Sequence, residues 1–207
     1  MSHSTVSRML LLTGRGTYPE EAVAALLLNR QFDSRTETEY GVQCRHLDSV
    51  FINAGTTSLE VIKILLDMRV TILTNNSMAT SLRTEKSKAT LILTGGEYNA
   101  TNRSFTGQLA LSLIEMAYAS VCILGINGVT AEKGLTTAFY PETMVNIEFM
   151  KRSKGKTIVI ADGSKIGKTY SFKTAPMEEV NILVTDSSAE AGELSKIKEL
   201  GTEVIIA

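Results

Sequence analysis

The chain has 207 residues, of which 21 are Lys or Arg and 22 are Asp or Glu, so its formal net charge at pH 7 is −1. Hydrophobic residues make up 43% of the chain and charged residues 21%, a balance that supports a folded core and excludes a disordered chain. The near-zero net charge argues against a concentrated basic face, so we do not expect this chain itself to grip nucleic acid. No apolar run reaches the roughly 18 residues of a membrane span, and we expect a cytoplasmic protein without a signal peptide.

Cysteine and histidine are too few and too scattered to suggest a metal or redox site. The two cysteines, Cys44 and Cys122, lie far apart in the sequence, and His3 and His46 are the only histidines. Neither spacing fits a disulfide framework or a metal-binding motif. We therefore predict no metal and no cofactor.

Residues 1–48 differ from the rest of the chain, and we expect a linker and N-terminal helices there. Pro19–Leu28 begins with a proline suited to a first helical position and continues with good helix formers. This helix is apolar nearly all round, which leaves two uses open: burial against a sheet, or contact with another subunit. A short exposed helix is predicted over Thr36–His46.

From residue 49 onward, apolar runs of strand length alternate with stretches of helical periodicity. This alternation predicts an α/β fold of three layers, α/β/α, around a mostly parallel sheet. Four amphipathic helices are expected at 58–68, 108–118, 142–152 and 189–200, the last ending at Gly201 as a C-cap. The strands are expected at 49–55, 70–75, 89–96, 120–128, 156–162, 181–186 and 203–207.

Small and polar residues follow five of the predicted strands. Because the carboxyl ends of parallel strands share one edge of the sheet, where ligands of open α/β folds bind, these loops predict a polar pocket without bulky walls. Glycine allows backbone N–H groups to approach an oxyanion, and a helix beginning after Gly55-Thr56-Thr57 offers free N–H groups and a positive dipole end. A phosphorylated or polyhydroxylated small molecule fits this pattern. Turn formation and helix capping are the alternative explanation for each loop taken alone.

Nucleotide-binding motifs are absent. The segment 163–169 has three residues between its glycines where a phosphate-binding P-loop needs four, and Gly125-Ile-Asn-Gly128 lacks the spacing of a dinucleotide fingerprint. Two other residues are candidates for ligand contacts. Lys165 could supply a full positive charge, and Glu142, just after Pro141, is either a first-turn carboxylate favoured by the helix dipole or an acceptor for ligand hydroxyls.

The order of these motifs resembles the C-terminal effector-binding domain of the DeoR family of bacterial transcription regulators. The series is Asn53-Ala-Gly-Thr-Thr, Thr74-Asn75-Asn76, Leu93-Thr-Gly95-Gly96, Gly125-Ile-Asn-Gly128 with Gly134-Leu-Thr-Thr137, Glu142, Ala161-Asp-Gly-Ser-Lys165-Ile-Gly167 and Val184-Thr-Asp186, and it covers residues 49–207. The resemblance implies a fold similar to sugar-phosphate isomerases and CoA transferases, and a domain that binds a phosphorylated sugar or related metabolite. It also implies that the bound effector alters DNA binding by an attached winged helix-turn-helix domain.

The resemblance assigns ligand-binding roles to strand-end and loop residues. They are Asn53; Gly55, Thr56 and Thr57 as the phosphate loop; Thr74, Asn75, Gly95 and Gly96 as pocket walls; Gly125 and Gly128 as close-approach backbone; Glu142 toward sugar hydroxyls; and Lys165 toward the phosphate or a hydroxyl. The family usually has an aspartate where this chain has Asn53, which keeps hydrogen-bonding capacity but removes a charge. Ala25 and Asp33 stand near the family's basic signature positions.

No DNA-binding domain is recognisable before residue 49, so the chain is either a family member without that domain or a fragment of a longer repressor. We expect the fragment, which contacts DNA only through an N-terminal domain outside it. A homodimer or homotetramer is expected because regulators that read paired half-sites are symmetric. The alternative function is a sugar-phosphate isomerase of the same fold. The predicted loop Gly125–Gly128 lacks the carboxylate base which that reaction needs.

Overall fold

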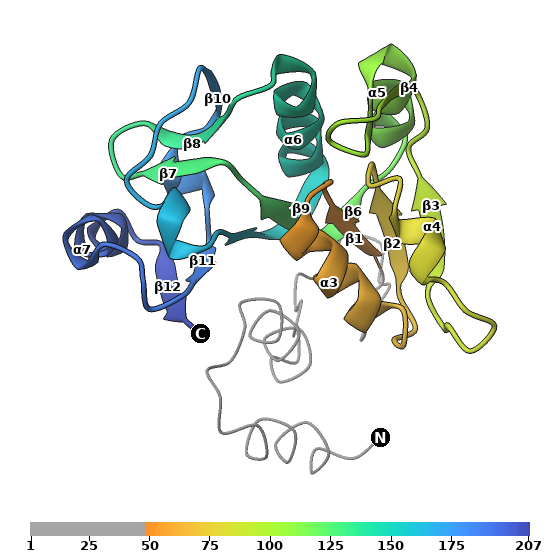
Figure 1. Cartoon of the computed structure of the whole chain (residues 1–207), viewed down its shortest axis with the longest axis horizontal. Helices are drawn as coiled ribbons and strands as arrows, with labels where there is room; N and C mark the ends of the chain where they lie inside the picture. Colours follow the sequence, from red (N-terminus) through yellow and green to blue (C-terminus); the bar gives the residue numbers. More distant parts are fainter. Residues whose placement is uncertain (1–48) are drawn as a thin grey trace, which may run out of the picture.

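A sheet of seven parallel strands forms the centre of the computed structural model, which describes residues 49–207 (Figure 1). The order across the sheet is β12-β11-β9-β6-β1-β2-β3, and every neighbouring pair is parallel. In chain order the strands are β1 (Ser49–Ile52), β2 (Thr71–Thr74), β3 (Thr90–Leu93), β6 (Ala119–Gly125), β9 (Ser153–Ile160), β11 (Ile182–Thr185) and β12 (Glu203–Ile206). Each coincides with one of the predicted apolar runs, so the predicted sheet is confirmed.

The strand order reverses at β1. The chain places β2 and β3 on one side of β1, and β6, β9, β11 and β12 on the other side. At such a switch point the connections leave neighbouring strands in opposite directions and open a crevice at their carboxyl ends. The ends of β1 and β6 are therefore where this fold leaves room for a ligand.

Helices cover both faces of the sheet, which confirms the three layers. The helices are α3 (Thr56–Leu65), α4 (Ala79–Leu82), α5 (Gly107–Glu115), α6 (Tyr140–Arg152) and α7 (Ala191–Glu199). On one face, Ile62 and Leu65 of α3 pack with Ile52 and Ile72. Helices α5 and α6 cover the opposite face (Figure 1). There the ring of Phe51 stacks on that of Phe149 at a centroid distance of 5.0 Å.

Four helices were expected and are present, with their ends shifted. Helix α3 starts at Thr56, two residues before the predicted start, and α6 starts at Tyr140 with Pro141 in its first turn. Gly201 follows α7 with φ 93°, the left-handed conformation expected of a C-terminal glycine. The single turn of α4 was not predicted.

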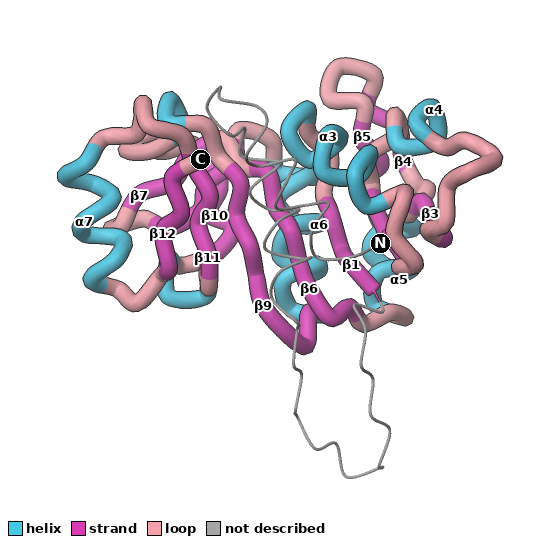
Figure 2. Tube along the Cα trace, turned by 90° about the horizontal axis from the view of Figure 1, so that it is seen from below, coloured by secondary structure: helices cyan, strands magenta, loops and turns pink. Residues whose placement is uncertain are grey.

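Short polar strands build two smaller sheets that the sequence pattern did not reveal. The antiparallel sheet β10-β8-β7 consists of β7 (Gly128–Thr130), β8 (Gly134–Thr137) and β10 (Phe172–Ala175), and β4 (Glu97–Asn99) pairs with β5 (Ser104–Thr106). Leu135 of the first small sheet packs with Val159, Leu183 and Ile197, so this sheet and α7 cover the β9–β11 part of the central sheet. Figure 2 shows α7 at one end of the molecule and α4 at the other.

One predicted strand is shorter than expected. The run 120–128 ends as a strand at Gly125, and Gly128 already belongs to β7 of the small sheet. The helices predicted at Pro19–Leu28 and Thr36–His46, and the proposed division of the chain at residue 48, lie outside the described residues. Within residues 49–207, no helix has the length and apolar character needed to cross a membrane.

Candidate functional site

A cavity of about 650 Å³ lies at the carboxyl ends of β1 and β6, where the strand order reverses. Its walls come from the start of α3, the β6–β7 loop, α6, the end of β9 and the β4–β5 turn. Elements far apart in the sequence therefore meet here. Of the residues predicted for the site, those that line this cavity are Asn53, Gly55, Thr56, Thr57, Gly125, Glu142 and Lys165.

The N-terminus of α3 is open toward the cavity. Gly55 is its N-cap, no side chain caps the helix, and its first turn carries no acidic residue. Leu59 is the first residue of this turn whose N–H reaches a backbone acceptor, the Gly55 carbonyl at 3.0 Å. Within residues 49–207, the N–H groups of Thr56, Thr57 and Ser58 have no backbone acceptor, and together with the helix dipole they make this end of α3 attractive to an anion.

Asn53 holds the two central strands together below this helix start. Its Oδ1 accepts from Gly125 N at 2.8 Å and from Ser58 Oγ at 3.0 Å. Its Nδ2 donates to Gly125 O at 2.7 Å and to Asn146 Oδ1 at 2.9 Å. Both lone pairs and both hydrogens of the amide are used, and the side chain is 4% exposed. Asn53 therefore lies at the cavity wall with its hydrogen-bonding capacity satisfied by the protein.

Gly125 is required at the end of β6 by the close approach of α3. A Cβ added to Gly125 would lie 2.9 Å from Ser58 Oγ and 3.6 Å from Asn53 Oδ1. Ser58 is fully buried, so its hydroxyl has little room to move away. This contact fixes the spacing between the end of β6 and the anion-receptive helix start.

Helix α6 contributes two polar side chains one turn apart. Glu142 was predicted; its Oε1 accepts from Ser104 Oγ at 2.8 Å, which ties α6 to β5. Asn146 also lines the cavity although it is only 2% exposed. Sequence reasoning missed Asn146 because it lies inside a helix, away from the strand ends. Its position four residues after Glu142, on the same helix face, is the one signal that could have found it.

Lys165 reaches the cavity from a 3₁₀ turn, Gly163–Lys165, that follows β9. Asp186 anchors this turn by accepting from Gly163 N at 2.9 Å. Hydrogen bonds from Ser188 and from Gly163 N lower the pKa of Asp186, so its carboxylate stays ionised in this position. Lys165 Nζ lies 3.9 Å from Asp162 Oδ2, the long limit of an ion pair, with a third of its side chain still exposed.

Arg103 supplies a second cation that the sequence analysis did not select. It stands at the end of the β4–β5 turn with φ 53°, the one left-handed non-glycine residue in the described part of the chain. Ser77 N and Ser77 Oγ both donate to the Arg103 carbonyl, at 2.9 and 2.8 Å, and hold this conformation. Arg103 lines the cavity and forms no ion pair among residues 49–207. Arg103 and Lys165 thus bring two positive charges to the cavity, whose lining also holds the carboxylates Glu142 and Asp162.

Two predicted wall residues use their side chains inside the protein instead of lining the cavity. Thr74 is fully buried, and its Oγ1 accepts from Asn76 N at 3.0 Å. Asn75 Oδ1 accepts from Ala54 N at 2.7 Å, and its Nδ2 donates to Phe105 O at 3.0 Å. Asn75 thereby supports the loop between β1 and α3 from the β2 side, whereas Thr74 bonds within its own loop.

Three predicted glycines also lie outside the cavity lining. A Cβ on Gly96 would lie 2.4 Å from Thr106 O, and one on Gly128 would lie 2.4 Å from Lys168 O. Gly95 has φ 62°, the left-handed conformation that glycine tolerates best. Within the described structure, these glycines allow the chain to turn and pack closely and do not touch the cavity.

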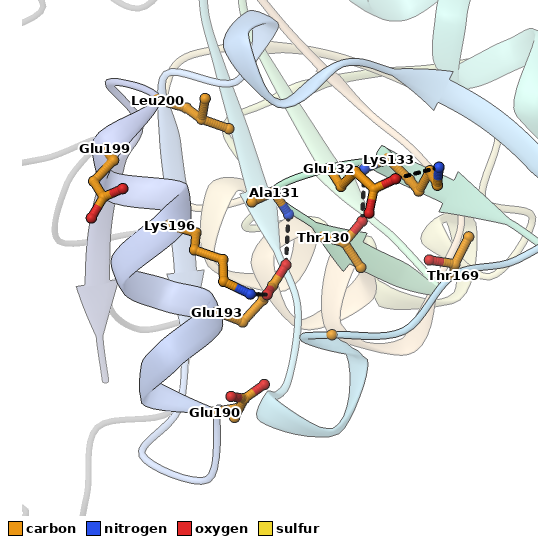
Figure 3. A pocket seen from close by; sticks show the side chains of 11 residues that line it. Thr130, Ala131, Glu132, Lys133, Thr169, Glu190, Glu193, Lys196, Glu199 and Leu200 are labelled. Atoms are coloured by element: carbon orange, nitrogen blue, oxygen red, sulfur yellow. Dashed lines mark hydrogen bonds and ion pairs between the residues drawn. The ribbon is translucent and has the colours of Figure 1, made fainter.

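A second cavity, of about 670 Å³, lies between α7 and the β7–β8 turn (Figure 3). Glu193 accepts there from Ala131 N at 2.7 Å and pairs with Lys196 Nζ at 3.2 Å. Its four glutamates outnumber its two lysines, which makes this cavity unsuited to an anion. None of the predicted site residues lines it.

The described residues offer no metal site: no group of three or more His, Cys, Asp or Glu side chains comes together within residues 49–207. Cys122 is fully buried in β6, and burial raises the pKa of its thiol, which keeps it protonated and unreactive.

Fold and cavity together define an α/β domain with a polar cavity at the switch point of its parallel sheet, the place where open α/β folds bind ligands. The family model "DeoR C terminal sensor domain" matches residues 42–187. The chain belongs to this family of sensor domains, as its order of motifs indicated.

Named transcription regulators are among the relatives of this chain. The transcriptional repressor AccR of Agrobacterium fabrum is 36% identical over 141 residues, 68% of this chain and 55% of that protein. The HTH-type transcriptional regulator GlpR of Haloferax volcanii is 31% identical over 158 residues, 75% of this chain and 61% of that protein. The repressor GlcR of Bacillus subtilis is 24% identical over 159 residues, 77% of this chain and 61% of that protein. The matched segments span little more than half the length of these relatives.

Solved structures with partial similarity include two ribose 5-phosphate isomerases. The enzyme from Methanocaldococcus jannaschii superposes with a TM-score of 0.39 at 13% identity, over 57% of this chain and 46% of the enzyme. The enzyme from Plasmodium falciparum gives 0.41 at 14% identity, over 72% of this chain and 52% of the enzyme.

Proposed function

We propose that the cavity at the ends of β1 and β6 binds a phosphorylated sugar or a related metabolite. The observation that carries this proposal is the meeting of the uncapped N-terminus of α3 with the cations Arg103 and Lys165 around one cavity. Free backbone N–H groups and cations together stabilise a phosphate dianion. Glu142 and Asn146 on the opposite wall offer hydrogen bonds to hydroxyl groups.

In the complete regulator, the bound effector would alter the DNA affinity of a helix-turn-helix domain. Support comes from the family match and from relatives named as repressors and HTH-type regulators. We further propose a cytoplasmic homodimer or homotetramer, because the symmetric half-sites that such regulators read call for symmetric proteins.

The isomerase alternative has less support. Moving a proton between adjacent carbons needs a carboxylate base held over the substrate. The loop after β6 contributes Gly125, Ile126 and Asn127 to the cavity and no carboxylate. Glu142 already accepts a hydrogen bond from Ser104, which suits a binding role. The family model that matches this chain describes a sensor domain.

A thermal-melt panel tests the proposed function. The 207-residue chain is melted with pentose, hexose and glycerol phosphates, with the same sugars lacking phosphate, and with inorganic phosphate. A phosphosugar at about 100 times its dissociation constant should stabilise the fold by about 2.7 kcal/mol. Stabilisation by a sugar phosphate without turnover is the expected result. Conversion of that compound to an isomer would favour the enzyme, and a melt that no phosphorylated compound shifts would refute phosphosugar binding.

A further inference from the structure

We propose that Asn146 is the specificity-determining residue of this cavity and donates a hydrogen bond to an oxygen on the carbon chain of the bound sugar phosphate. Asn53 acts as the positioning residue that sets the direction of the Asn146 amide. This inference rests on the proposed function, and it assigns one contact within the site.

The orientation of Asn53 follows from the backbone of Gly125. Gly125 N is a donor and Gly125 O is an acceptor, and both contact the same Asn53 amide, at 2.8 and 2.7 Å. Only one arrangement satisfies both groups: Oδ1 faces the N–H and Nδ2 faces the carbonyl. The second hydrogen of Nδ2 must then point to Asn146, 2.9 Å away.

Asn146 is oriented in turn by Asn53. Because Asn53 Nδ2 is a donor, the Asn146 atom that faces it is Oδ1, and Asn146 Nδ2 is turned the other way. Within residues 49–207 this Nδ2 donates to no group. It is also not one of the unpaired polar atoms that are fully shielded from solvent, so it remains accessible. Since the side chain is 2% exposed and lines the cavity, the donor opens onto the cavity itself. An unpaired donor on a nearly buried side chain points to a ligand oxygen as its partner.

Glu142 adds an acceptor one helical turn earlier on the same face of α6. Its Oε1 is engaged by Ser104, and the carboxylate has acceptor capacity left for a ligand hydroxyl. The Asn146 donor and the Glu142 acceptor are four residues apart on one face of the helix, so they can contact neighbouring oxygens on the carbon chain of one ligand. The recognised group is therefore an acceptor oxygen at Asn146 with a hydroxyl beside it at Glu142, the chemistry of a polyol or hydroxycarbonyl chain.

Substitution of Asn146 isolates this contact. Asn146→Asp keeps the acceptor for Asn53 and replaces the donor by an oxygen, and Asn146→Leu removes both groups without adding charge. Asn181→Asp is the matched control: Asn181 lies before β11, far across the sheet from β1, and its side chain uses only Oδ1, which accepts from Thr157 N at 2.7 Å. The probes are the best-binding sugar phosphate of the panel, its deoxy analogues and inorganic phosphate, titrated calorimetrically into the whole chain.

For the wild type and Asn181→Asp, we expect removal of one particular oxygen from the sugar phosphate to weaken binding about tenfold. The measured quantity is the ratio of the dissociation constants without and with that oxygen. For both Asn146 variants this ratio should fall to about one, because the donor that bound the oxygen is gone. Inorganic phosphate should bind the uncharged Asn146→Leu variant as it binds the wild type. Asn53→Asp should lower the ratio too, because its carboxylate would draw the Asn146 amide nitrogen away from the cavity.

An unchanged ratio in Asn146→Leu and Asn146→Asp would overturn the inference while leaving the proposed function intact. Binding of no sugar phosphate by the wild type would instead refute the proposed function, and the inference with it.

Discussion

Replacing Asn53 by aspartate should destabilise the protein at neutral pH although the two side chains have the same size. The change is electronic and not steric. In Asn53→Asp the carboxylate keeps the bonds from Gly125 N and Ser58 Oγ but cannot donate to Gly125 O, 2.7 Å away. The Gly125 carbonyl would then face a negative oxygen at a side chain that is only 4% exposed.

The cost follows from these contacts. A buried acceptor left without its donor costs about 1–3 kcal/mol. Asn146 can rotate its amide and donate to the new carboxylate, which recovers the second lost hydrogen bond. We therefore expect a loss of about 2 kcal/mol in the free energy of unfolding, or about 4–8 °C in melting temperature for a protein of this size.

Urea denaturation followed by circular dichroism measures this loss at pH 7 and at lower pH. The protonated carboxyl can donate to Gly125 O, so the difference between wild type and variant should shrink as the pH falls. Asn181→Asp, which keeps its one side-chain hydrogen bond, should unfold like the wild type. Equal stability of the wild type and Asn53→Asp at pH 7 would refute the assignment of Asn53 as a buried, saturated link between β1 and β6.

Three further predictions concern the cavity and its supports. Replacing Arg103 or Lys165 by Ala should weaken sugar phosphate binding about tenfold each, or about 1.4 kcal/mol, in calorimetric titration; unchanged affinity would place that residue outside the site. Gly125→Ala should lower the free energy of unfolding by about 1–3 kcal/mol, because the new methyl group would lie 2.9 Å from Ser58 Oγ; a wild-type melting temperature would contradict this. Asp186 has a lowered pKa, so its ionised form stabilises the fold, and this contribution is lost as the pH falls from the ordinary value of 3.8 through the lowered one. The stability difference between the wild type and Asp186→Asn should therefore be largest near neutral pH and disappear in acid; a difference independent of pH would count against it.

Much of the candidate site could be read from the sequence because ligand-binding loops in this fold follow strands. Gly55, Thr56 and Thr57 come directly after β1 and line the cavity at the start of α3. Thr74 and Asn75 follow the same pattern after β2, yet their side chains bond within the protein. The sequence pattern is the same in both loops, but the outcome differs. The packing around each loop decides whether a polar side chain faces solvent or bonds to another part of the chain.

Residues from outside the strand ends could not be found in this way. Arg103 reaches the cavity through the hairpin of β4 and β5, and Asn146 through the middle of α6. Both are distant from Asn53 along the chain. Their roles depend on long-range packing, which no local periodicity records.

The seven strands of the central sheet and its main helices could be predicted from the sequence, because a strand buried on both faces must be an apolar run and a covering helix must be amphipathic. The strand order, the five short strands of the smaller sheets and the composition of the cavity wall depend on how the whole chain packs. A short strand such as β10 gains its stability from pairing with a distant segment, β8, and not from its own composition. The reversal of strand order beside β1 is likewise a property of the whole chain, and it is this reversal that opens the cavity between β1 and β6.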